Sequence, residues 1–123
     1  MIENSQKYYL ICDEILKIDN LIRFAGIYVQ GEFYHKIQEG KQSLLTEEET
    51  KKSLLQALLR WKSRKLLSHK IGMPICTVTQ YEKLSRATLS YGNDDLCLIS
   101  LELDAKPFEI SKKVSEIIHK YSE

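Results

Sequence analysis

Residues 96–103, which read LCLISLEL, decide the fold because they are apolar at almost every position. A strand with one side in solvent alternates apolar and polar residues, so a run this apolar predicts a central strand covered on both faces. The turn-rich stretch 91–95 (YGNDD) joins it to residues 85–91 (SRATLSY), which read as a second strand. The sequence therefore predicts a sheet with helices on both sides.

Three further stretches have the composition of strands. Residues 75–81 (ICTVTQY) lead through EKL into the strand at 85–91. Residues 22–29 (IRFAGIYV) and 32–37 (EFYHKI) flank Gln30 and Gly31, a pair typical of tight hairpin turns. Strands joined by short turns pair antiparallel, because parallel neighbours need a long crossover connection. We therefore expect one antiparallel sheet of five strands.

A long helix is predicted between the second and third strands in chain order. Thr46 and Glu49 fit a capping box, and Gly72 with Pro74 stops the helical pattern. We expect a helix that runs to about Lys70, roughly 36 Å long at 1.5 Å per residue. On a helical wheel its large apolar side chains form one broad arc: Leu54, Leu55, Leu58, Leu59, Trp61 and Leu66. We expect the tryptophan in this arc to be at least half buried.

Two terminal helices complete the predicted architecture. Residues 3–18 carry apolar side chains at helical spacing, and a last helix begins near Asp104 and Pro107. The element order α-ββ-α-βββ-α predicts a single α+β domain over residues 1–123, with a single five-stranded antiparallel sheet and three helices. We expect the long helix on one face of the sheet and the terminal helices on the other.

Composition excludes several classes of function. The chain has 18 Lys and Arg against 17 Asp and Glu, so no global charge drives it onto DNA or anionic lipid. Three cysteines far apart, without a CxxC pair, predict buried free thiols in a reducing cytoplasm. No apolar run approaches the roughly 20 residues that span a bilayer. With no complete catalytic motif, we expect no enzyme activity, cofactor or metal.

Segments of the sequence resemble known families. The predicted layout resembles the roadblock/dynein-light-chain group, whose architecture is shared with longin and profilin domains. Over residues 15–103, the motifs IRFAGI, EETKKSLLQALLRW, KIG and YEKLSRATL resemble a family of small archaeal proteins prominent in ammonia-oxidising lineages. The roadblock resemblance implies a homodimer formed through the long helix and an edge strand, and a role as a scaffold or regulator of small GTPases.

The stretch 58–72 is strongly basic and contains no acidic residue. Cations at the end of the long helix, opposite Glu47 to Glu49 in its first turn, complement the helix dipole. A partner or dimer surface, or a site for nucleic acid or lipid, are the other interpretations. The absence of a helix-turn-helix, zinc-finger or RNA-binding signature argues against nucleic acid as a partner.

One polar cluster has the character of a site. Tyr81, Glu82 and Lys83 precede a strand on which Arg86 and Thr88 alternate to one face. Three interpretations remain for this cluster: a surface Glu82–Arg86 salt bridge, an anion or ligand pocket, and an interface. The resemblance also singles out Gln56, Arg60 and Trp61 on the long helix. The candidates for ligand or interface contacts are Gln56, Arg60, Trp61, Arg64, Tyr81, Glu82, Lys83, Arg86 and Thr88.

Three functional hypotheses follow from these features. The first is a non-enzymatic, cytoplasmic interaction, scaffold or regulatory module that homodimerises. The second is a small-molecule or anion-sensing domain of PAS or GAF type, with a ligand held against Tyr28, Tyr34, Tyr81 and Arg86. The third is a weak nucleic-acid binder that uses Arg60 to Lys70.

Overall fold

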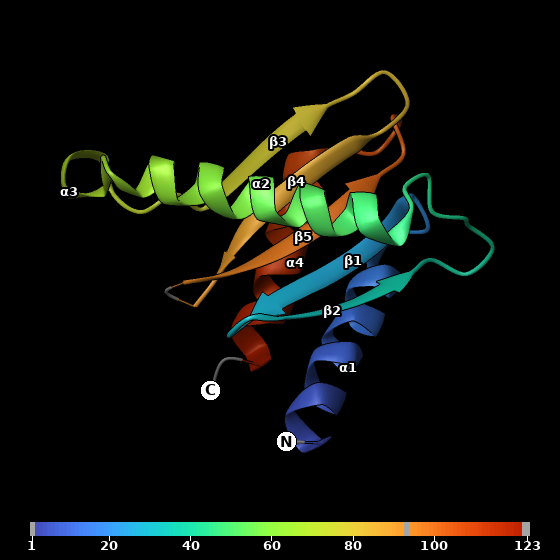
Figure 1. Ribbon diagram of the computed structural model, residues 1–123. Helices are drawn as coiled ribbons and strands as arrows, with labels where there is room; N and C mark the ends of the chain where they lie inside the picture. The colour runs from blue at the N-terminus through green and yellow to red at the C-terminus, as the bar shows by residue number, and fades with distance from the viewer. Residues whose placement is uncertain (1, 93, 122–123) are drawn as a thin grey trace.

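The computed structural model describes residues 2–92 and 94–121, so Met1, Asn93 in the expected 91–95 turn, Ser122 and Glu123 lie outside the described residues. The chain forms a five-stranded antiparallel sheet flanked by helices (Figure 1). This α+β architecture and its element order are as predicted, apart from one additional short helix. The elements are α1 (Ile2–Ile18), β1 (Ile22–Val29), β2 (Glu32–Ile37), α2 (Glu47–Lys65), α3 (Ser68–Ile71), β3 (Cys76–Gln80), β4 (Ser85–Tyr91), β5 (Asp95–Leu101) and α4 (Pro107–Tyr121).

The strands lie in the order β2-β1-β5-β4-β3, so the apolar run LCLISLEL supplies the central strand. Leu96 to Ile99 are all buried, which confirms that both faces of β5 are covered. The predicted β1–β2 hairpin turns at Gln30 and Gly31, whose φ angles are 50° and 86°. Two successive positive φ angles are what a type I′ turn requires, and they match the twist of the flanking strands.

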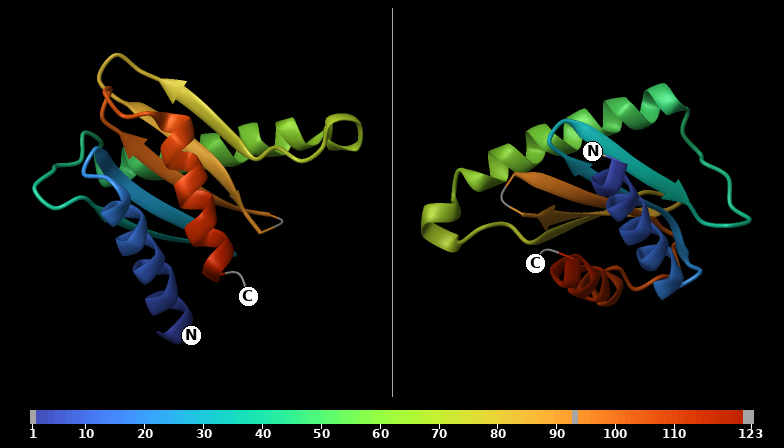
Figure 2. Two further views of the ribbon diagram at one scale, coloured as in Figure 1. Left: turned by 180° about the vertical axis from the view of Figure 1, so that it is seen from behind. Right: turned by 90° about the horizontal axis from the view of Figure 1, so that it is seen from below.

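The helices form two unequal layers around the sheet (Figure 2). On one face, α1 packs on β1 and β2, α4 packs on β4 and β3, and the two helices touch each other. This layer holds the main core, which includes the fully buried Ile15, Ile27, Leu101 and Val114. On the opposite face α2 crosses the strands alone (Figure 1). The predicted division of the helices between the two faces is therefore confirmed.

The predicted capping box begins α2. The side chain of Thr46 accepts a hydrogen bond from the backbone N–H of Glu49, and the Glu49 carboxylate accepts one from the backbone N–H of Thr46. Further along, Trp61 is only 3% exposed and packs with Leu96 and Leu98 of the central strand. The expectation that Trp61 is at least half buried is confirmed, and its contact is with the sheet.

The expected continuous helix to Lys70 is wrong, because α2 ends at Lys65. The backbone N–H of Leu66 bonds to the carbonyl of Ser63, which tightens the last turn, and the four-residue α3 follows. The end of α2 extends past the sheet (Figure 1), and none of residues 62–71 is buried, so packing against the sheet does not support further turns. Gly72, with a φ of 90°, ends α3.

The three cysteines are free thiols, as predicted, but the predicted burial holds for only two of them. Cys12 and Cys97 are fully buried, whereas Cys76 on the edge strand β3 is partly exposed. Burial raises the pKa of the Cys12 thiol to about 12. These two buried thiols are therefore packing residues and not reactive nucleophiles.

Candidate functional site

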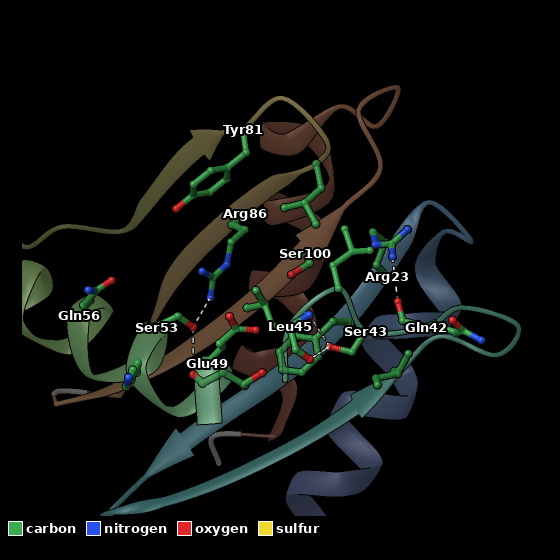
Figure 3. Close-up of a pocket in the computed structure, with 16 residues that line it drawn as sticks. Arg23, Gln42, Ser43, Leu45, Glu49, Ser53, Gln56, Tyr81, Arg86 and Ser100 are labelled. Atoms are coloured by element: carbon green, nitrogen blue, oxygen red, sulfur yellow. Dashed lines mark hydrogen bonds between the residues drawn. The ribbon is translucent and has the colours of Figure 1, made fainter. Parts of the chain in front are cut away.

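A pocket of about 430 Å³ lies between the first half of α2 and the sheet. Its outer wall is the loop of residues 38–46, which joins β2 to α2 (Figure 3). Its floor is formed by side chains of β1, β4 and β5 on the face that α2 crosses. This volume falls within the range of small-molecule sites, roughly 300–1,000 Å³.

Arg86 reaches into this pocket from β4 (Figure 3). Its backbone is fixed between two neighbouring strands, because it pairs with Thr79 on β3 and Ser100 on β5. Its guanidinium donates a hydrogen bond of 3.0 Å to the hydroxyl of Ser53 on α2, which itself donates to the carbonyl of Thr50. The arginine thus links the sheet to the helix through a neutral partner.

The expected Glu82–Arg86 salt bridge does not form among the residues that the structure describes. Glu82 lies in the β3–β4 turn and is exposed, whereas Arg86 points across the face of the sheet toward α2. Glu82 belongs to the turn that precedes β4, which begins at Ser85, whereas the Arg86 side chain lies on the face of β4 that α2 covers. On the long helix Arg86 meets the hydroxyl of Ser53.

Ion pairs hold the pocket loop against the body of the protein. Arg23 on β1 donates to the Glu102 carboxylate at 3.0 Å and to the backbone carbonyl of Gln42 at 2.9 Å. Lys41 forms a second ion pair with Glu102. The Lys41 ammonium, followed by Arg23, lowers the pKa of Glu102 below its usual value. At the start of the loop, the Gln38 side-chain amide donates to the backbone carbonyl of Leu16 at 2.8 Å.

The structure brings only part of the predicted site together. Three of the predicted residues line the pocket: Gln56 from α2, Tyr81 from the turn after β3, and Arg86 from β4 in the floor. Thr88 lies on the same face of β4 as Arg86 but outside the lining, and Lys83 is exposed in the β3–β4 turn.

The other candidates on the long helix do not reach the pocket. Arg60 and Arg64 are exposed on the second half of α2, and Trp61 is buried against the sheet. The tyrosine pocket of the sensor hypothesis is corrected as well. Tyr34 points to the other face of the sheet, where its ring lies 5.1 Å from that of Tyr8, while Tyr28 packs beneath α2. Tyr28 and Tyr34 are separated because neighbouring strands carry them on opposite faces.

Sequence reasoning missed the apolar wall of the pocket. Leu44 and Leu45 line it from the loop, Phe24 and Ile37 line it from the sheet, and Leu84 lines it from the β3–β4 turn. The available signal was the pair of leucines in an otherwise polar loop, QEGKQSLL. Apolar residues in a polar connection indicate a contact with something apolar nearby.

The broad apolar arc of the long helix divides into two faces. Leu54, Ala57 and Trp61 are buried against the sheet, whereas Leu55 and Leu59 on the other side are 60% and 69% exposed. The helix lies on the sheet with one side of the predicted arc, so only one stripe of it is buried. We call the exposed set that continues toward β3 the apolar ridge; it comprises Leu55, Leu59, Leu66, Leu67, Ile71, Met73 and Ile75, each 53–79% exposed.

The described chain contains neither a cluster of metal ligands nor a helix that could span a membrane. Over residues 2–92 and 94–121, His, Cys, Asp and Glu side chains nowhere gather in a group of three that could hold a metal ion. Within the same residues, no helix has the length and apolar character needed to cross a membrane.

Comparison with known proteins was informative at the level of structure. No protein-family model matches the chain, and no curated protein matches its sequence. Myxococcus xanthus MglB is similar with a TM-score of 0.72 and 12% identity, over 96% of this chain and 86% of that one. The gliding protein MglB of Thermus thermophilus has a TM-score of 0.70 and 16% identity, over 94% and 88%.

A third solved structure carries the fold in its own name. The Roadblock/LC7 domain from Streptomyces avermitilis is similar with a TM-score of 0.67 and 7% identity, over 90% of this chain and 91% of that one. At such low identities these likenesses bear on the fold, and the five-stranded antiparallel sheet between α2 and the two terminal helices agrees with it. The chain has the roadblock/LC7 fold.

Proposed function

We propose that this chain is a non-enzymatic interaction module that pairs with a second copy of itself through α2 and β3. The observation that carries the proposal is the apolar ridge. Leu55, Leu59 and Leu66 share one helix face, since they are spaced by four and seven residues. Large apolar side chains gathered on one exposed element are typical of an interface.

Strand β3 supplies the second element of the proposed interface. It lies at the edge of the sheet and pairs with β4 alone, so the backbone groups on its outer side have no strand partner within the described residues. Unpaired edges of this kind readily pair with another chain. The ridge leads into this strand, because Met73 and Ile75 lie three residues and one residue before Cys76, where β3 begins. A two-fold axis beside β3 would join two sheets and bring two copies of α2 together.

The fold comparison supports an assembly of this kind. One solved structure with the same fold, similar with a TM-score of 0.66 and 14% identity, is described as MglB with a tetrameric arrangement. That arrangement belongs to MglB. For this chain it supports the expectation that a roadblock/LC7 fold with an exposed apolar ridge associates with further copies.

We also propose that the partner of the dimer is a small GTPase, as the roadblock resemblance implies, and that the module works in the cytoplasm as a single domain. The free thiols of Cys12, Cys76 and Cys97 support a reducing compartment. The chain would act by presenting a surface and not by chemistry of its own. Its basic segment from Arg60 to Lys70 adjoins the ridge and would lie at the rim of the interface.

The oligomeric state tests the dimer. Sedimentation equilibrium at micromolar concentration should give twice the 14.3 kDa mass of one chain. Leu59→Glu should yield a folded monomer, because it places a charge in the centre of the apolar ridge. Phe108→Glu is the matched control: Phe108 is 68% exposed, nearly the same as Leu59, but lies on α4. A wild-type mass of one chain would contradict the dimer.

The partner class needs a separate test. Each small GTPase of the source organism, loaded in turn with GDP and with a non-hydrolysable GTP analogue, is titrated with the chain by calorimetry. We expect at least one to bind in a nucleotide-dependent manner. If none binds, the GTPase proposal is wrong and the dimer proposal is unaffected.

A further inference from the structure

The pocket under the first half of α2 combines a cation with an apolar wall. The cation is Arg86, which is partly buried in the pocket floor. A guanidinium has five N–H donors. Within the described residues its side chain makes one hydrogen bond, to the neutral hydroxyl of Ser53, and no ion pair. Most of its donors and its whole charge thus remain available to a ligand in the pocket.

The other charged groups of the lining set the charge that a ligand can carry. Arg23 is already occupied by Glu102 and by the carbonyl of Gln42. Glu49 and Lys52 both stand at the helical wall and have opposite signs, so they offset each other. Among the described residues, Arg86 is therefore the one partly buried cation of the lining that has no ion pair. One carboxylate matches this single partly buried cation, whereas a more highly charged anion would bring additional negative charge next to the Glu49 carboxylate.

The remaining lining indicates the body of the ligand. Leu44, Leu45 and Ile37 are 57%, 40% and 42% exposed, and all three face the pocket. Their apolar surface would leave water if an apolar group lay between the loop and α2, at a gain of about 25 cal/mol per Å² covered. Tyr81 closes the far side near Arg86 (Figure 3). Its ring adds a further apolar surface close to the cation.

The walls of the pocket are held in place by contacts other than those available to a ligand. The loop is fixed by the ion pairs of Glu102 and by the Gln38 amide, and α2 is fixed by its capping box and by Trp61. Arg86 is oriented by Ser53. A site whose parts are already positioned loses little conformational entropy when a ligand enters.

We propose that this pocket binds an amphipathic monocarboxylate. The carboxylate is held by the planar guanidinium of Arg86, which matches its two oxygens. The apolar tail lies between the loop leucines and Ile37. The site is separate from the apolar ridge, because none of the seven ridge residues lines the pocket. The ligand proposal therefore does not depend on the proposed dimer.

Calorimetric titration of the full chain with four probes tests the proposal. Octanoate carries both the head group and the tail, octanol has the same tail without charge, acetate has the head without the tail, and inorganic phosphate is a more highly charged anion. We expect octanoate to bind at least tenfold more tightly than each of the others. Charge-assisted hydrogen bonds to one guanidinium account for a difference of this size against octanol.

Variants test the two parts of the site separately, the guanidinium of Arg86 and the apolar wall. Arg86→Gln should reduce octanoate affinity at least tenfold and remove its advantage over octanol, while Arg86→Lys should retain part of both. Leu44→Ser should weaken octanoate several-fold with no effect on acetate. Arg60→Gln is the matched control, since Arg60 is exposed on α2 outside the pocket. Circular dichroism establishes that each variant is folded.

Three results would overturn the proposal: equal affinity of the wild-type chain for octanol and octanoate, tighter binding of phosphate than of octanoate, or failure of all four probes to bind. Unchanged octanoate affinity in Arg86→Gln would also overturn it. If Arg86→Gln does not fold, the comparison of Arg86→Lys with Leu44→Ser decides in its place. Leu59→Glu should bind octanoate as the wild type does, which separates this result from that of the dimer test.

Discussion

The two faces of the sheet differ in how completely they are covered. On the face of α1 and α4, eighteen buried residues form one continuous core. On the face of α2, five of the residues whose burial the structure describes form a smaller cluster around Trp61. Two helices cover the first face and one helix covers the second, so the second face retains a pocket at one end of α2 and the apolar ridge on its outer side (Figures 1 and 2).

This difference separates the part of the molecule that stabilises the fold from the part available for binding. Residues of the first face are occupied by their neighbours, and their role is packing. On the second face, Arg86 has no ion pair within the described chain, and the side chains of Leu55 and Leu59 are exposed to solvent. Exposed apolar groups that gather in one place are typical of interaction surfaces, so the apolar ridge is where we expect a partner to bind.

The largest effect is expected from the face of α1 and α4. Leu101→Ala should lower the free energy of unfolding by about 4 kcal/mol, because it leaves a cavity at a fully buried position. Leu103→Ala, two residues further on and 45% exposed, is the matched control and should cost less than about 1 kcal/mol. Urea denaturation of both variants provides the measurement. Equal losses would mean that this face is not the dominant core.

Truncation of the tryptophan tests the smaller core under α2. Trp61→Ala should lower the free energy of unfolding by about 3 kcal/mol, since a large buried aromatic is lost. The oligomeric state should stay as in the wild type, because the side chain contacts the sheet and not the ridge. Urea denaturation measures the free energy of unfolding, and sedimentation measures the oligomeric state. A stable monomer in place of a dimer would instead assign Trp61 to the interface.

The pocket loop should make stability depend on pH. Lys41, followed by Arg23, lowers the pKa of Glu102 in the folded chain, so its contribution is present above the unfolded pKa of roughly 4.3 and is lost as the pH falls through the folded value. Between pH 7 and pH 3 the wild type should therefore lose more stability than Glu102→Gln. Thermal unfolding across this range is the measurement. Parallel pH profiles for the two chains would exclude this ion-pair cluster as a source of stability.

The smallest effects are expected from the basic stretch at the end of α2. Lys62→Gln and Lys65→Gln should each change the free energy of unfolding by no more than about 0.5 kcal/mol. Lys65 does form an ion pair of 3.3 Å with Asp94, but the Asp94 side chain is 90% exposed, so solvent screens the attraction. Urea denaturation is again sufficient. A loss of several times this size would reveal specific buried contacts of the basic segment.

Much of the fold could be predicted because its signals are local. The alternation in SRATLSY places every second residue of β4 in the core, and the apolar run LCLISLEL becomes the central strand. Thr46 and Glu49 encode the start of α2 through a bond within one turn of chain. The same holds for the turn at Gln30 and Gly31. Each of these features depends on residues within a few positions of one another.

The candidate site was predicted only in part, because its members meet across the fold. Tyr81 and Arg86 were identified from a polar cluster, and Gln56 from the family resemblance. Their common pocket depends on how α2 crosses the sheet. The Glu82–Arg86 pair suggested by sequence proximity is absent, and Arg86 bonds to Ser53, which is thirty-three residues away. Proximity in the chain did not predict the partner of Arg86, because its long side chain reaches a residue on another element.

The sequence by itself determined the main elements and their order and the antiparallel sheet, since periodicity, capping and turn chemistry act over short distances. Tertiary structure alone decided which half of the apolar arc of α2 is buried, where that helix ends and which side chains share a pocket. A helix on a flat sheet buries a single stripe, and it persists only as far as packing supports it. The leucines at positions 55 and 59 are as apolar as that at 54, and only the position of the sheet distinguishes them.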